Sequence, residues 1–133
     1  MAEFTNALPQ TVALGANVIF TDNPVKACPC VRHRDGSGLF TFRGGHKYLV
    51  VFSGNISGAT AGTEVDLAIT IGGEEIPSTR MAATPAVAED LNNVAAFIEL
   101  EVPSCCCYNV SVENVGTTAL TVANANLVIF RKD

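Results

Sequence analysis

The stretch that most constrains the fold runs from Glu64 to Arg80 and combines a strand pattern with a tight turn. Hydrophobic side chains alternate with small or polar ones along residues 65–71 (VDLAITI), which is the period-2 pattern of a half-buried strand. The pair Gly72–Gly73 follows, and glycine readily adopts the positive φ that a two-residue hairpin turn requires. Pro77 lacks the N–H that a central strand donates, so the returning strand should lie at a sheet edge or end there. The segment predicts a β-hairpin and contains nothing for catalysis.

Similar strand patterns recur along the chain, with turn residues between them. They cover residues 11–20 (interrupted at Gly15–Ala16), 39–42, 46–56, 94–102, 107–115 and 120–132. Residues 81–93 have the only helix-friendly composition, but Pro85 limits any helix to a turn or two, so we expect a loop that crosses between sheets. Roughly eight strands without a sustained helical period predict an all-β protein, an antiparallel sandwich or jelly roll. We expect residues 1–10 to form an N-terminal arm that leads into the first strand, and residues 11–133 to form one domain.

Two of these strands are apolar on both faces. In residues 46–56, Tyr48, Val50 and Phe52 share one face while Leu49 and Val51 lie on the other, and residues 127–130 (LVIF) are apolar throughout. A strand that is apolar on both faces is covered on both faces. The chain is 48% hydrophobic and only 16% charged, which leaves little charge to cover its exterior. We therefore expect other copies of the chain to hide part of this surface.

The charge pattern disfavours several classes of partner. The net charge is −5 and no run of lysines or arginines is present, so a phosphate-binding stripe for nucleic acid or an anionic membrane is not expected. No apolar run approaches the roughly 20 residues that cross a bilayer. The first ten residues have neither a basic nor an apolar region, so we do not expect a signal peptide. A protein of this kind would leave a cell by another route, for instance within a particle released by lysis.

Five cysteines form the one group that resembles a metal site. They are Cys28, Cys30, Cys105, Cys106 and Cys107. Three interpretations stay open: a metal site that also uses His33, a disulfide between the two groups, and unpaired thiols that pack as small hydrophobic residues. The odd count and the absence of an export signal favour reduced, partly buried thiols. The redox and metal states are therefore not fixed by the sequence, and no metal or cofactor is assigned.

Catalytic constellations are weak throughout the sequence. A cysteine could pair with His33 or His46, but no sequence context activates one. The carboxylates of Asp66, Glu99 and Glu101 occupy positions that should face solvent and do not suggest a catalytic pair. Residues 32–34 (RHR) are better explained as a patch that forms salt bridges with an acidic neighbouring chain, and the glycines of residues 36–38 precede a strand, so no phosphate loop is expected. The sequence predicts no active site and hence no enzyme.

The complete pattern resembles a known family of small jelly rolls. The segments VDLAITIGGEEIPST, FIELEVPSC and YNVSVENVGTTALTVANANLVIFR are similar to TNF/C1q-like jelly rolls of bacterial exosporium proteins and phage structural proteins. The openings MAEFTNALPQTVALGANVIFTD and HRDGSGLFTFRGG resemble short proteins encoded among the virion genes of tailed phages and prophages. A collagen-like Gly-X-Y stem, as in exosporium proteins, is absent. The resemblance implies a homotrimer packed around a threefold axis and supplies no catalytic residues.

Three functions follow as hypotheses. The first is an auxiliary virion protein of a tailed phage or prophage, a capsid-decoration or head-fibre protein, which assembles in the host bacterial cytoplasm and contacts the major capsid protein or another virion component. The alternative is a receptor- or glycan-binding module of a fibre that uses loops 57–63 and 81–93, although Tyr48 and Tyr108 are the only tyrosines and no tryptophan is present to stack on sugars. The third, a cupin-like metal enzyme, would need more than two histidines.

Overall fold

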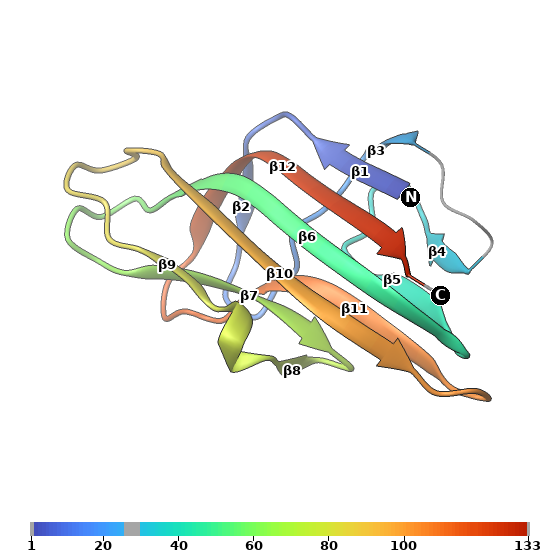
Figure 1. Cartoon of the computed structure of the whole chain (residues 1–133). Helices are drawn as coiled ribbons and strands as arrows, with labels where there is room; N and C mark the ends of the chain where they lie inside the picture. Colours follow the sequence, from blue (N-terminus) through green and yellow to red (C-terminus); the bar gives the residue numbers. More distant parts are fainter. Residues whose placement is uncertain (1, 26–29, 133) are drawn as a thin grey trace.

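The chain folds into two antiparallel β-sheets that face each other, as the computed structural model of residues 2–25 and 30–132 shows (Figure 1). Sheet I has the strand order β10-β6-β12-β1-β3, and β2 also pairs with β12; sheet II has the order β4-β5-β11-β7-β8, and β9 also pairs with β7. The strands of sheet I are β1 (Ala2–Asn6), β2 (Gln10–Val12), β3 (Asp22–Val25), β6 (His46–Ser57), β10 (Asn92–Val102) and β12 (Leu120–Arg131). Those of sheet II are β4 (Val31–His33), β5 (Phe40–Arg43), β7 (Val65–Ile71), β8 (Glu74–Glu75), β9 (Met81–Ala83) and β11 (Cys107–Asn114). The predicted all-β jelly-roll sandwich is confirmed.

The number of strands exceeds the eight or so expected. The described residues contain twelve strands, and six of them (β2, β3, β4, β5, β8 and β9) are only two to four residues long. Such short strands carry too few residues for a period-2 pattern to be recognised. The long strands β6, β10, β11 and β12 lie where the alternation of side chains predicted them.

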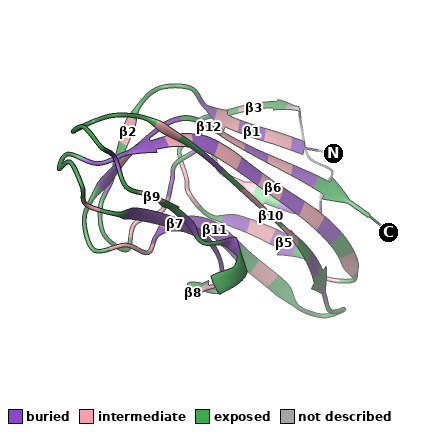
Figure 2. Ribbon diagram, turned by 60° about the vertical axis from the view of Figure 1, so that its left-hand side comes forward, coloured by how far each residue is buried: buried purple, intermediate pink, exposed green. Residues whose placement is uncertain are grey.

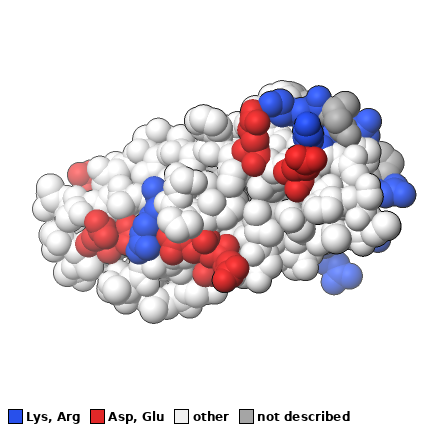
Figure 3. All heavy atoms as spheres, turned by 60° about the horizontal axis from the view of Figure 1, so that its bottom comes forward, with Lys and Arg blue, Asp and Glu red and all other residues white. Residues whose placement is uncertain are grey.

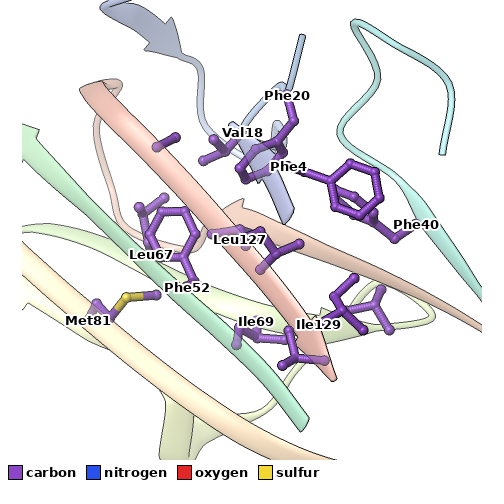
Figure 4. Close-up of a cluster of buried hydrophobic side chains, with 14 of the residues drawn as sticks. Phe4, Val18, Phe20, Phe40, Phe52, Leu67, Ile69, Met81, Leu127 and Ile129 are labelled. Carbon is purple, nitrogen blue, oxygen red and sulfur yellow. The ribbon is translucent and has the colours of Figure 1, made fainter. Parts of the chain in front are cut away.

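The hydrophobic core lies between the two sheets, and four phenylalanines connect its parts (Figure 4). The ring of Phe40 on β5 meets Phe4 of β1 at 4.8 Å and Phe20 at 5.5 Å between ring centroids, and Phe20 in turn meets Phe52 of β6 at 6.4 Å. All three contacts are edge-to-face, an arrangement that aromatic rings favour. These contacts join the two sheets across the sandwich.

The β7–β8 hairpin has the predicted turn, and the strand after it is interrupted. Gly72 and Gly73 have φ values of 62° and 85°. Pro77 begins the short 3₁₀ turn η1 (Pro77–Thr79), which separates β8 from β9 along the edge of β7. The hydroxyl of Thr79 occupies this gap: it accepts a hydrogen bond from the backbone N–H of Ile69 at 3.0 Å and donates to the carbonyl of Ile76 at 2.7 Å. A side chain thus supplies the partner that the proline-interrupted strand cannot.

The N-terminal segment differs from the arm expected over residues 1–10 and from the strand expected over residues 11–20. Within the expected arm of residues 1–10, Ala2–Asn6 form β1 between β12 and β3 inside sheet I. The expected strand over residues 11–20 forms only as far as Val12. Beyond it the chain crosses to sheet II, where the N–H of Val18 donates to the carbonyl of Val112 at 2.8 Å. Gly15, with φ of 72°, lies at the start of this crossing.

No helix among the described residues is long and apolar enough to span a membrane.

Candidate interaction surface

The outer face of sheet I carries a set of apolar side chains in register. Phe97 of β10 lies opposite Val51 of β6, which lies opposite Val128 of β12. One step along the strands, Leu49 lies opposite Phe130. Cross-strand partners project from the same face of a sheet, so these five residues, which we term the apolar strip, form one continuous surface.

The strip is only partly shielded by the chain itself. Phe97 is 70% exposed and Phe130 is 38% exposed, while Leu49, Val51 and Val128 are half-buried. Their neighbours along the same strands, such as Val50, Phe52 and Leu127, point the other way and are fully buried. The alternation of buried and half-buried positions runs along β6 and β12 in Figure 2. The predicted second apolar face is therefore present.

Polar contacts surround the strip. Lys132 Nζ lies 2.6 Å from Glu99 Oε1 at one end, and the Asn126 amide donates to Glu3 Oε2 at 2.7 Å on the β1 side. At the opposite end the Asn93 amide donates to Asn55 Oδ1 at 3.2 Å. An apolar centre with a hydrogen-bonded polar rim is the usual anatomy of a protein–protein interface.

The strip reaches the edge of the sheet. β10 is an edge strand of eleven residues, with Phe97 near its middle. Long edge strands with exposed apolar side chains are sites where another chain packs, unless charge or a covering segment blocks them. Burial of apolar surface is favourable by about 25 cal/mol per Å², so the apolar strip can bind a complementary protein surface.

The sequence predicted the outer apolar face of β6 and β12 but not the part that Phe97 of β10 adds to it. On the other face of the same strand, Leu100 and Val102 are buried. The signal was nonetheless present, since Phe97 is in phase with the outward residues Glu99 and Glu101. A phenylalanine on the outward face of an alternating strand is the observation that could have completed the strip.

The cysteines and His33 do not form the considered metal site among the described residues, and Cys28 lies outside them. Cys30 is 5% exposed and disulfide-bonded, whereas Cys105, Cys106 and Cys107 are free and exposed. None of these three is therefore the disulfide partner of Cys30, and the expectation that they are partly buried is wrong. His33 stacks on Phe40 with 4.3 Å between ring centroids, and its Nε2 lies 2.8 Å from the carbonyl oxygen of Ser37, so its contacts are structural.

The three carboxylates considered for acid–base chemistry lie on different sheets. Glu99 and Glu101 project from β10 into solvent, as expected. Asp66 on β7 does not: it is 3% exposed, and its Oδ2 lies 3.2 Å from a guanidinium nitrogen of Arg80. The hydrogen bond with Asp66 raises the pKa of Arg80 above its ordinary value. The Asp66–Arg80 ion pair is therefore a structural contact on the outer face of sheet II.

Loops 57–63 and 81–93, considered for glycan binding, lie side by side at one end of the sandwich (Figure 1). The N–H of Gly62 donates to the carbonyl of Pro85 at 2.7 Å, and the N–H of Glu89 donates to the carbonyl of Gly58 at 2.8 Å. The two loops contain no aromatic residue. Tyr48 is fully buried, with its hydroxyl 2.8 Å from the carbonyl of Arg43, so it is no platform for a sugar; Tyr108 is half-buried.

Comparison with known proteins supports the fold. No protein-family model and no curated protein sequence matches the chain. Among solved structures, the globular domain of zebrafish complement 1qA aligns over 98% of both chains with a TM-score of 0.67 at 14% sequence identity. The CBM35 domain of Cellvibrio japonicus Abf62 aligns over 98% of both chains with a TM-score of 0.47 at 6% identity. The chain thus has the C1q-like jelly-roll fold.

Proposed function

We propose that the chain is a non-enzymatic structural subunit that assembles as a homotrimer and serves as an auxiliary protein of a phage virion, of the capsid-decoration or head-fibre type. The observation that carries the self-association is the apolar strip. Five apolar side chains lie in register on an outer sheet face that the chain itself leaves partly exposed. A second copy is a suitable cover, because an apolar surface with a polar rim needs a partner surface rather than a small ligand.

The position of the strip suggests how copies would pack. Phe97 lies at the edge of sheet I, whereas Val128 lies two strands further in. If the edge of one copy contacts the inner part of the strip on the next, the two contacting patches differ. Such a head-to-tail contact closes into a ring when the rotation from copy to copy is a whole fraction of a full turn, and otherwise gives an open filament. A ring of three is what the resemblance to TNF/C1q-like jelly rolls implies.

The virion role rests on the sequence resemblance and on composition. Only 16% of residues are charged, which suits a protein that stays in an assembly. The partner in that case is the major capsid protein or another virion component, and the place of action is the particle.

The self-association is tested by the native mass at micromolar concentration. We expect three copies for the wild-type chain and one copy for Val51→Asp, since the new carboxylate lies in the middle of the strip. Val87→Asp is the matched control, because Val87 is 65% exposed in the 81–93 loop, away from the strip. A wild-type monomer, or a trimer that survives Val51→Asp, would refute the proposed interface.

The virion role is tested separately. A culture that carries the gene is induced, the particles are purified by density gradient, and the chain is quantified by immunoblot. We expect it in the particle band at many copies per particle. Presence in the lysate with absence from the band would exclude the virion role while leaving the self-association intact.

A further inference from the structure

A hollow of about 320 Å³ on the outer face of sheet II combines a free thiol with two guanidinium groups. It is lined by Cys30, Arg32, Thr41, Arg43 and Cys107. Cys107 on β11 lies directly opposite Arg43 on β5, and the N–H of Arg43 donates to the carbonyl of Cys30 at 2.7 Å on the other side. The three residues therefore form a row across neighbouring strands, with the arginine in the middle.

The hollow is suited to an anion. Arg32 and Arg43 are exposed, and neither has an acidic partner among the residues that the structure describes. An adjoining open hollow shares Arg32 and adds Arg34. Among the residues that the structure describes, no acidic side chain lines either hollow. Guanidinium groups bind carboxylates through paired, charge-assisted hydrogen bonds, so a small molecule with carboxylates fits this lining.

The thiol of Cys107 is free and exposed, and Cys30 is not its disulfide partner. Cys30 lies on the far side of β5, and two strand spacings of about 4.8 Å separate their backbones by about 10 Å. A disulfide requires Cα atoms within about 7 Å, and Cys30 is already disulfide-bonded. Cys107 therefore remains available to an external reagent.

We propose that Cys107 is a site of reversible S-thiolation by an anionic low-molecular-weight disulfide of the glutathione class. Arg32 and Arg43 would bind the carboxylates of the reagent and hold its sulfur–sulfur bond next to the thiol. The Cys107 thiolate attacks one sulfur of the reagent, a new bond forms between the two sulfurs, the reagent's own disulfide bond breaks, and one low-molecular-weight thiolate leaves. The thiol proton goes to solvent, and an excess of the free thiol reverses the step.

This chemistry selects Cys107 over its neighbours. Cys105 and Cys106 are equally free, but they lie on the turn between β10 and β11 and do not line the hollow. The arginines act on the reagent, so the selection should depend on the reagent's charge. The proposal is independent of self-association, because the apolar strip lies on sheet I.

The test uses two variants that each keep one of these three thiols. Cys105→Ser with Cys106→Ser leaves Cys107, and Cys106→Ser with Cys107→Ser leaves Cys105. Each folded protein is incubated with oxidised glutathione or with the neutral bis(2-hydroxyethyl) disulfide, and intact mass follows the adduct. We expect the ratio of the Cys107 rate to the Cys105 rate to be about tenfold higher with oxidised glutathione, and to fall in high salt.

The role of the hollow is tested by Arg43→Ala in the variant that retains Cys107. This change should remove most of the preference for the anionic reagent, and Arg43→Lys should keep part of it. Lys47→Ala is the matched control, since Lys47 is an exposed cation that does not line the hollow. Equal rate ratios for the two reagents, or an Arg43→Ala protein that keeps the full preference, would overturn the proposal.

Discussion

The outer faces of the two sheets differ in how they are covered. On sheet II, Arg80 extends over the face from Glu75 on β8, at 3.1 Å, to Asp66 on β7, and Thr70 and Ser111 hydrogen-bond to each other between β7 and β11. Figure 3 shows this face, with a basic side chain between acidic ones and few other charges near it. On sheet I, by contrast, no such segment of the described chain covers the apolar strip, and Phe97 is largely exposed.

The contrast supports the apolar strip as the proposed interface. The six residues from Val65 to Thr70 are all buried, so β7 has both faces covered within a single chain. β6 and β12 are also apolar on both faces, yet their outer residues remain half-exposed. A face that the chain covers serves stability, whereas an apolar face that it leaves open is available to a partner.

The largest difference between the two sheets should come from placing a carboxylate on each outer face in turn. We expect a loss of stability on sheet II and a loss of assembly on sheet I. Ala68 on β7 is fully buried, lies opposite Glu113, and shares its face with Asp66. Ala68→Asp therefore buries a third carboxylate beside two others, and we expect it to lower the free energy of unfolding by at least about 3 kcal/mol. Val51→Asp should leave the protomer folded and abolish only the assembly.

Urea unfolding followed by circular dichroism, combined with native mass, separates the two outcomes. Ala68→Ser controls for the change in size at the buried position. If Ala68→Asp is as stable as the wild type, the outer face of sheet II is accessible to water and the contrast between the faces fails.

The sequence predicted those elements that can be recognised from the residues of one short segment. The hairpin at Gly72–Gly73 and the long strands β6, β10 and β12 carry their own alternation and turn residues. Asp66 illustrates what could not be predicted. Its position in the alternation is that of a solvent-facing residue, and its burial depends on Arg80, fourteen residues away, and on the path of the chain through η1.

The candidate interaction surface also has a part that local sequence patterns predict and a part that depends on contacts between distant segments. The apolar outer face of β6 and β12 was visible as apolar residues at successive positions, and period 2 alone assigns them to opposite faces. Phe97 extends the same surface only because β10 pairs with β6. This pairing places Phe97 opposite Val51, 46 positions earlier in the chain, and no local pattern encodes it. The hollow near Cys107 likewise requires the order β4-β5-β11, which no single segment encodes.

A smaller effect is expected from the hydroxyl that completes the edge of sheet II. Thr79 is buried, and its Oγ1 is the partner of the Ile69 N–H. Thr79→Val keeps the shape and leaves this donor unpaired, so the free energy of unfolding should fall by about 2 kcal/mol. Chemical denaturation of Thr79→Val, Thr79→Ser and the exposed control Thr117→Val measures it. A loss as large in Thr117→Val would show that the effect is not specific to the interrupted edge.

The smallest effect is expected at the rim of the apolar strip. The ion pair between Lys132 and Glu99 is short, but both side chains are substantially exposed, so solvent screens their attraction. Glu99→Gln should change the free energy of unfolding by less than about 0.5 kcal/mol, and should leave the native mass unchanged. The measurement is repeated in high salt, where the difference from wild type should vanish. A loss of assembly in Glu99→Gln at every salt concentration would mean that this ion pair is buried between copies, and the boundary of the interface would then lie beyond Glu99 rather than at it.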